Sequence, residues 1–245
     1  MYRRSHADGN TSVTGRTDAR PPGLGLSHEA GVRRWALVGL VAQLAFVASW
    51  LISASWQGPH YSSLVHSMSD MYAVGAPYGA FLVVVFTLCG AATILFAWLS
   101  LRPALRPAGW TATVGSALLA LSIYGLGDLL SPLEREGCRL ADRGCTAAAQ
   151  FANSGGKLDA ALSTLGGVLF ILAGFFLASA MKRLPGWRRW AWPARGVAVL
   201  FVVLVVATVL GTAVDLGGLF ERLLAATGAA GIALLAAGVL QRSQA

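Results

Sequence analysis

The stretch GVAVLFVVLVVATVLGTAVDL, residues 196–216, contains a single charged residue, Asp215. An α-helix rises about 1.5 Å per residue, so a helix of this length would be about 30 Å long. That is roughly the thickness of the hydrocarbon core of a bilayer. A run this long and this apolar predicts a transmembrane helix rather than a core helix of a soluble protein.

Five further runs of similar length are also nearly free of charge. With the first run, the expected spans are residues 35–55, 80–101, 110–130, 158–181, 196–216 and 219–240. Only 12% of the 245 residues are charged, whereas soluble domains usually carry about 25%. We therefore expect an all-α integral membrane protein, with a six-transmembrane-helix bundle over residues 33–241.

Residues 1–32 precede the first span and have a different composition. They are rich in Arg, Gly, Ser, Thr and Pro and have no hydrophobic period, which predicts a disordered tail. A secretory signal is the alternative, because Ser53-Ala54-Ser55 resembles a small-residue cleavage site. It is disfavoured because the apolar run is longer than the roughly 7–15 residues of a signal core.

Basic residues flank the spans unevenly and indicate the orientation of the chain. If the N-terminus is inside, 14 of the 19 Lys and Arg residues lie on the inner side of the membrane. This excess predicts that both termini are cytoplasmic, in a multi-pass protein of the plasma membrane. The net charge of +8 does not indicate nucleic-acid binding, because the basic residues sit in short clusters beside apolar runs. Tyr72 and Tyr124 are expected at the outer interface.

Prolines and glycines mark the ends of the expected spans. Residues 102–107 contain Pro103 and Pro107 and are expected to form a basic turn that is not helical throughout. No span carries a Gly/Pro pair at mid-depth, and the discontinuous helices of many transporters would require such a break.

The polar stretch HYSSLVHSMSDMY, residues 60–72, is expected at the outer mouth of the bundle. It contains His60 and His66, whose spacing of six matches no standard zinc pattern. Solvated loop histidines are therefore favoured over metal ligands. Ser69 is expected to cap a short helix that begins at Asp70.

Acidic residues outside the tail all lie on the outer side of the expected topology. We hypothesise that four of them form one ligand-binding site, together with His60, His66 and Ser69: Asp70, Asp128, Asp159 and Asp215. Arg222 and Lys157 are the internal cations that would neutralise this site. If they do not reach it, the site is expected to attract a metal ion or a cationic lipid headgroup. The alternative is that these carboxylates are independent and solvated at the interface.

The three cysteines divide into a pair and a single thiol. Cys138 and Cys145 share an outer loop, and seven residues are enough for a turn to bring their Cα atoms within about 7 Å. A disulfide between them is predicted, because the outer side is oxidising. Reduced thiols are the alternative. Cys89, within a span, is expected to stay reduced and buried.

Three short segments carry a family resemblance. They are Ser67-Met68-Ser69-Asp70-Met71, then Gly155-Gly156-Lys157-Leu158-Asp159, then Gly217-Gly218-Leu219-Phe220-Glu221-Arg222-Leu223. In order and spacing the chain resembles the DUF998 family of six-helix bacterial membrane proteins over residues 35–241. Members often open the fourth helix with a histidine, where this chain has Lys157 and Asp159. The resemblance implies the fold and the membrane location, and no particular activity.

Three classes of function remain open on the sequence. A binding or sensing protein, with an acidic outer vestibule for a cation or a cationic headgroup, is the leading expectation. A small transporter subunit and a membrane enzyme acting on lipid are the alternatives. Catalysis is disfavoured because no nucleophile elbow, phosphate loop or zinc-protease motif is present. No cofactor is expected, since no span contains the histidines that haem would need. The expected partner is the lipid bilayer, and no nucleic acid.

Overall fold

The computed structural model describes residues 23–242, with side chains from Glu29 onward. All regular secondary structure in this part of the chain is helical. The α-helices are α1 Gly23–Ser53, α2 Gly79–Phe96, α3 Arg102–Leu105, α4 Trp110–Leu121, α5 Ala147–Gln150, α6 Ser154–Lys182, α7 Arg188–Gly211 and α8 Gly217–Arg242. Two π-helical segments, η3 Ala97–Leu101 and η5 Ile123–Gly127, follow α2 and α4. Short 3-10 turns are η1 Ala54–Trp56, η2 Ser69–Met71, η4 Arg106–Ala108, η6 Pro185–Trp187 and η7 Thr212–Val214.

The N-terminal tail expected over residues 1–32 falls mostly outside the described residues, which begin at 23. Residues 23–32 belong to α1, so the helix starts earlier than expected. No proline interrupts the sequence between residue 23 and the first apolar run, and an uninterrupted backbone can therefore continue the helix toward the N-terminus.

Within residues 23–242, five helical segments are long and apolar enough to cross a membrane. They are Glu29–Trp56, Gly79–Ala108, Ser154–Lys182, Pro185–Val214 and Gly217–Arg242, while Trp110–Leu121 is a shorter apolar helix. The chain therefore has the helices of a multi-pass membrane protein.

The second span is longer than expected because residues 102–108 are helical. The structure corrects the expected basic turn here into two short helices, α3 and η4. Pro103 and Pro107 each lie in the first turn of one of them. The missing N–H of proline costs no hydrogen bond at that position, so proline is tolerated there.

The helix expected over residues 110–130 is interrupted, and the expectation of one continuous helix is wrong. Ser122 has φ −69° and ψ 175°, which is extended backbone. Its hydroxyl donates to the carbonyl of Leu119 at 2.8 Å, so it satisfies a carbonyl at the end of α4. The chain then turns back tightly in η5: a Cβ on Gly125 would lie 2.1 Å from the carbonyl oxygen of Ala120. The interruption contains no proline, and the sequence pattern therefore gave no sign of it.

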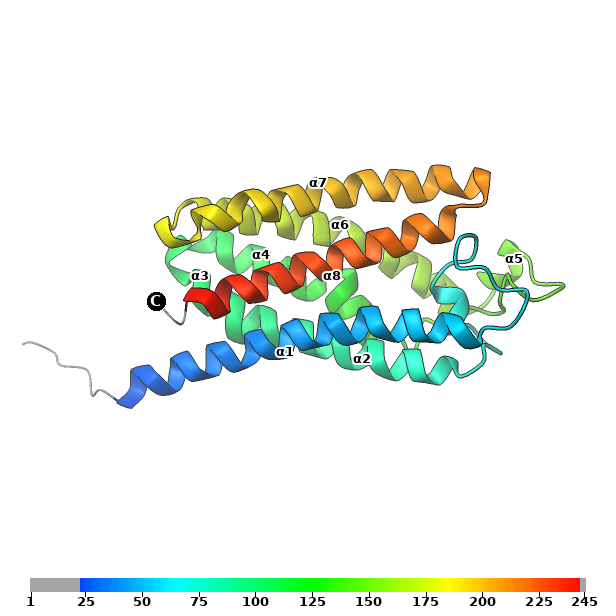
Figure 1. Cartoon of the computed structure of the whole chain (residues 1–245), viewed down its shortest axis with the longest axis horizontal. Coiled ribbons are helices and arrows are strands. Elements are labelled where there is room, and N and C mark those ends of the chain that lie inside the picture. Colours follow the sequence, from blue (N-terminus) through cyan, green and yellow to red (C-terminus); the bar gives the residue numbers. More distant parts are fainter. Residues whose placement is uncertain (1–22, 243–245) are drawn as a thin grey trace, which may run out of the picture.

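The long helices lie side by side (Figure 1), and their contacts close into a ring. Around it, α1 packs on α2, α2 on η5 and α4, α4 on α6, α6 on α7, α7 on α8, and α8 on α1. The start of α1, α3 and the end of α8 lie at one end of the bundle, and the long connecting loops lie at the other (Figure 1).

An aromatic cluster fills the centre of this ring. Five segments each contribute one ring: Phe46, Phe86, Tyr124, Phe170 and Phe201. Neighbouring ring centroids lie 4.8–6.3 Å apart, within the usual range for tilted and edge-to-face pairs. The expected place of Tyr124 at the outer interface is wrong, because only 4% of it is exposed. Its hydroxyl donates to the carbonyls of α8, which satisfies it in the core.

Candidate functional site

Two loops cover one end of the bundle and make the most polar part of the molecule. We define the cap as residues 57–78 and 130–153, which include η2 and α5. Figure 1 shows both loops together at the end of the bundle where α7 turns into α8. Hydrogen bonds between the loops, such as Val74 N–H to the carbonyl of Glu136 at 2.9 Å, make them one unit.

Arg222 of α8 anchors the first cap loop to the bundle. Its guanidinium donates to the carbonyls of Ser63 at 2.7 Å, His66 at 2.9 Å and Gly218 at 2.8 Å, and to the phenol oxygen of Tyr61. Burial raises the pKa of Tyr61 to about 12, so this phenol stays neutral. Arg222 therefore binds backbone carbonyls, and it forms no ion pair with an aspartate of the described residues.

Asp70 anchors the second cap loop to the first. The residue is fully buried, and its carboxylate accepts hydrogen bonds from the backbone N–H of Leu140 at 2.5 Å and of Ala141 at 3.3 Å. These two N–H donors lie within the loop that the disulfide between Cys138 and Cys145 closes, with Cα atoms 5.9 Å apart. Asp70 therefore holds the disulfide loop against the polar stretch.

Glu136 joins three cap segments and is 2% exposed. One carboxylate oxygen accepts from the hydroxyl of Ser69 at 3.0 Å and the other from the amide of Gln150 at 2.6 Å. Ser69 does not cap the turn at Asp70, because it is the first residue of η2. Ser67 takes that role: its hydroxyl accepts from the N–H of Asp70 at 3.3 Å.

Tyr72 closes the end of the bundle and corrects a second aromatic expectation. It is 7% exposed rather than at the interface. Its ring packs edge-on against Phe86, 5.8 Å away, and its hydroxyl donates to Asp159 of α6 at 3.2 Å. Burial, and then the nearby charges of four acidic side chains, raise the pKa of Tyr72 well above its ordinary value. These side chains are Asp159, Glu134, Glu136 and Asp128.

Three of the carboxyls around Tyr72 have few hydrogen-bond donors, and we call Asp128, Glu134 and Asp159 the carboxyl triad. The Tyr72 hydroxyl is the side-chain donor to Asp159. Glu134 is 5% exposed and its Oε1 has no hydrogen-bond partner among the described residues. Asp128 and Asp159 are both close enough to Glu134 for their charges to interact with it. No Lys or Arg side chain of the described residues forms an ion pair with the triad.

Burial raises the pKa values of three carboxyls in the cap loops, Asp70, Glu134 and Glu136. Burial, and then the charge of Asp159, raise the pKa of Glu134 from 4.5 to about 8. Burial likewise raises the pKa of Glu136 to about 8, against the hydrogen bonds from Ser69 and Gln150 that lower it. Burial also raises the pKa of Asp70, although the two backbone N–H groups lower it.

The other residues of the expected site lie elsewhere on the cap or at its edge. His60 is exposed, whereas His66 stacks on Tyr61 and its Nδ1 accepts from the N–H of Ser62 at 2.9 Å. Lys157 is exposed on α6. Asp215 is exposed in the turn before α8, with φ 59°, and forms no hydrogen bond or ion pair with another described side chain. The structure thus places Asp128 and Asp159 near Glu134, holds Asp70 against the disulfide loop, and leaves Asp215 exposed.

Glu134 and Glu136 were missed at the sequence level because they stand in a loop with several charges. Their spacing of two residues could have indicated that both face the same side. Residues two apart in extended chain point to the same side, and Arg135 between them points elsewhere, donating to the carbonyls of Tyr72 and Ala73. Such alternation predicts two carboxyls facing one surface.

The chemistry open to the cap follows from its donors and acceptors. Within the described residues, no group of three His, Cys, Asp or Glu side chains is arranged to hold a metal ion. A buried carboxyl without a donor or a cation is stable only when it is protonated. Among the described residues this condition applies to Glu134, which lies near Asp128 and Asp159.

The three segments that carry the family resemblance meet at this cap. Asp70 lies in the first, Asp159 in the second and Glu221 in the third, and Glu221 accepts from the N–H of Met68 at 3.0 Å. A Cβ on Gly218 would lie 2.3 Å from the carbonyl oxygen of His66, and one on Gly155 would lie 2.2 Å from that of Arg135. The glycines of the second and third segments thus allow the cap loops to sit directly on the helix ends.

Comparison with known proteins identifies a family for this chain and no individual relative. No curated protein and no solved structure matches the chain. A family model described as "Protein of unknown function (DUF998)" matches residues 40–238, which is most of the chain, and the chain therefore belongs to the DUF998 family.

Proposed function

We propose that this protein is a six-span membrane protein that binds protons at the carboxyl triad beneath an outer cap. The uneven distribution of Lys and Arg supports an orientation with both termini in the cytoplasm and the cap outside. A sixth span is supported by the position of α4 and η5 in the ring, between α2 and α6. A segment enclosed between two spans lies at their depth in the bilayer.

The observation that carries the proposal is the unpartnered oxygen of Glu134. The side chain is buried, lies near Asp128 and Asp159, and has no donor for Oε1. Leaving a buried acceptor unsatisfied costs about 1–3 kcal/mol, and more for a charged group. A proton on one or more members of the triad removes the repulsion and supplies a donor. This makes the proton the cation that best fits the acidic site, ahead of a metal ion or a cationic headgroup.

Infrared difference spectroscopy of the purified protein tests the proposal. Between pH 9 and pH 6 the spectrum should gain the carbonyl band of a protonated carboxylic acid. Glu134→Gln should remove part of this band, and Asp215→Asn, which changes an exposed carboxylate, should leave it unaltered. A wild-type protein without a carboxylic-acid band in this range would refute proton binding. A band that disappears when Na⁺ or Ca²⁺ is added would assign the site to a metal cation instead.

A second candidate function is proton transport, and the interruption of the helix at Ser122 favours it. Discontinuous helices line the binding sites of many transporters, and π-helical segments often lie at functional sites. Asp128 follows η5 directly, so the interruption adjoins the triad. Proteoliposomes with an internal pH indicator and an imposed K⁺ diffusion potential test this. Wild-type protein should acidify or alkalinise the lumen with the sign of the potential, and Asp128→Asn should abolish the change. A flux equal to that of empty liposomes would leave a binding or sensing role.

A further inference from the structure

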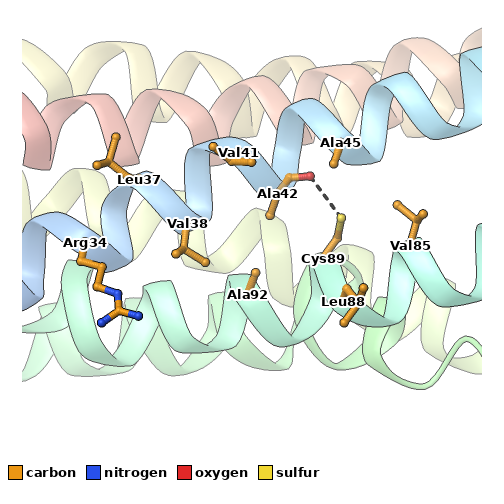
Figure 2. A pocket seen from close by; sticks show the side chains of 10 residues that line it. All are labelled: Arg34, Leu37, Val38, Val41, Ala42, Ala45, Val85, Leu88, Cys89 and Ala92. Carbon is orange, nitrogen blue, oxygen red and sulfur yellow. Dashed lines mark hydrogen bonds between the residues drawn. The ribbon is translucent and has the colours of Figure 1, made fainter.

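A groove lies between α1 and α2 on the surface of the bundle, far from the cap. Its volume is about 530 Å³, within the roughly 300–1,000 Å³ of small-molecule sites. Figure 2 shows Arg34 at one end of the groove, Ala45 and Val85 toward the other, and Cys89 and Ala92 between them. Every lining residue except Arg34 is apolar or is the thiol of Cys89.

Small side chains form the floor of the groove and large ones its rim. Ala42 and Cys89 are 8% and 3% exposed, whereas Val41 and Leu88 are 61% and 65% exposed. The thiol of Cys89 donates to the carbonyl of Ala42 at 3.1 Å (Figure 2). The one polar group of the floor is therefore engaged inside the protein, and the floor presents hydrocarbon to its occupant.

Some basic residues at the same end of the bundle lie over aromatic rings, whereas Arg34 does not. Arg102, Lys182 and Arg189 lie over the rings of Trp98, Trp192 and Trp190. Arg34 is exposed and makes no hydrogen bond, ion pair or ring contact with a described residue. Its guanidinium has five N–H donors in a planar fork, the geometry that matches a phosphate group in bidentate fashion.

The length of the groove matches one leaflet of a bilayer. From Arg34 to Ala45 helix α1 rises about 16 Å at 1.5 Å per residue, and half of a hydrocarbon core of roughly 30 Å is about 15 Å. A lipid whose headgroup lies beside Arg34 would therefore have its acyl chain along the groove as far as the middle of the bilayer.

We propose that this groove binds an anionic phospholipid, with its phosphate on Arg34 and one acyl chain between α1 and α2. The site recognises two features at once: a negative headgroup at the end of α1 that carries Arg34, and a hydrocarbon chain in the adjoining leaflet. Neither feature alone fills the site, so a soluble phosphate compound is bound poorly. The occupant comes from the leaflet in contact with the start of α1, whichever side of the membrane that is.

Native mass spectrometry of the full-length protein tests the proposal. The probes are phosphatidylglycerol and phosphatidylcholine with identical acyl chains, and glycerol 3-phosphate as a headgroup without chains. Wild-type protein should retain phosphatidylglycerol in preference to phosphatidylcholine, and glycerol 3-phosphate should not compete. Arg34→Gln should lower the affinity for phosphatidylglycerol about fivefold, the contribution typical of one basic residue near an anionic headgroup.

Two matched controls separate binding from general damage. Arg33→Gln removes the neighbouring exposed arginine, which does not line the groove, and should keep the preference. Ala45→Leu fills the apolar end and should reduce retention of phosphatidylglycerol, while Ala48→Leu, exposed but outside the groove, should not. Equal retention of the two lipids by wild-type protein, or equal losses in Arg34→Gln and Arg33→Gln, would overturn the proposal. A dimer that Ala45→Leu dissociates, without any lipid preference, would overturn it in favour of a second copy of the chain.

Discussion

At the scale of single residues, the buried carboxyls of the cap differ in the donors that face them. Asp70, Glu136 and Glu221 each accept hydrogen bonds and thereby join segments of the cap. Glu134 has a buried oxygen without a donor. A carboxylate that accepts hydrogen bonds from other segments stabilises the fold. A buried carboxyl oxygen without a donor favours the protonated form of its side chain.

Asp70→Asn should destabilise the protein by about 1–3 kcal/mol. The two carboxylate oxygens accept from the N–H groups of Leu140 and Ala141, and the substitution replaces one of these oxygens with an NH₂ group. That NH₂ group faces a backbone N–H, so a buried donor is left unsatisfied. Asp215→Asn, at an exposed position, should change stability by less than about 0.5 kcal/mol. Thermal unfolding in detergent compares the two variants. Equal melting temperatures would mean that Asp70 does not hold the disulfide loop.

The pH dependence of stability should follow the carboxyls of Glu134 and Glu136. Their pKa values rise from 4.5 to about 8 on folding, so between these values the folded state binds more protons than the unfolded state. The stability they contribute is fully present below about pH 4.5 and is lost as the pH rises through about 8. Melting temperatures should therefore fall from pH 5 to pH 9. Glu134→Gln should flatten the fall, while Asp215→Asn should keep the wild-type slope; a rise with pH would contradict the prediction.

At the scale of elements, the interrupted segment around Ser122 is held by the glycines of its neighbours. A Cβ on Gly90 of α2 would lie 2.3 Å from the N of Leu129, and one on Gly166 of α6 would lie 2.6 Å from the N of Ile123. Both contacts are with backbone, which cannot move aside as a side chain does. The continuous helices α2 and α6 thus pack closely against the backbone of the interrupted segment on both sides.

Gly90→Ala should destabilise the protein by about 2–3 kcal/mol and disturb η5, because the added methyl group overpacks this contact. Gly196→Ala in α7 is the matched control, since nothing lies within 4 Å of a Cβ there. Alanine in an open helical position should stabilise by up to about 1 kcal/mol. Thermal unfolding gives both values. If Gly90→Ala proved as stable as Gly196→Ala, the close packing of α2 on η5 would be disproved.

The disulfide loop should protect two of the three cysteines from labelling. After denaturation without reductant, a maleimide should label only Cys89, which is buried and free in the folded protein. After reduction it should label all three. Because the closed loop is short, replacing Cys138 and Cys145 with serine should cost less than the roughly 3 kcal/mol expected for a 15-residue loop. Labelling of all three cysteines before reduction would exclude the bond.

At the scale of the whole molecule, the ring of helices determines which residues meet. Closing the ring places Phe46 of α1 beside Tyr124 of η5, and Tyr124 beside Phe201 of α7. The same closure brings the ends of α6 and α8 that carry Asp159 and Glu221 under one cap.

The orientation of the molecule should place the cap outside and both termini in the cytoplasm. Reporter fusions after residue 242 and within residues 131–153 test this, using one reporter active in the cytoplasm and one active outside it. The C-terminal fusion should be active in the cytoplasm and the loop fusion outside. A C-terminus outside would invert the molecule, place the triad on the cytoplasmic side, and leave the loop disulfide in a reducing compartment.

The candidate site could be predicted only in part, because its members come from four separate segments. The topology placed Asp70, Asp128 and Asp159 at one end of the bundle, since residues at the same ends of neighbouring spans share a depth. It placed Asp215 there as well, but depth does not say which way a side chain faces, and Asp215 faces solvent. Glu134 and Glu136 were missed because burial of a loop depends on what folds over it.

The sequence by itself determined the helical class and the multi-pass membrane character of the chain, because apolar length acts locally along the chain. Only the tertiary structure decided where the helix after Trp110 is interrupted, because the break contains no proline and its backbone packs closely against Gly90 of α2 and Gly166 of α6. The tertiary structure also decided that Tyr72 and Tyr124 are buried and that Arg222 holds backbone carbonyls instead of aspartates. These outcomes depend on which groups meet when the ring closes, and no local pattern carries that information.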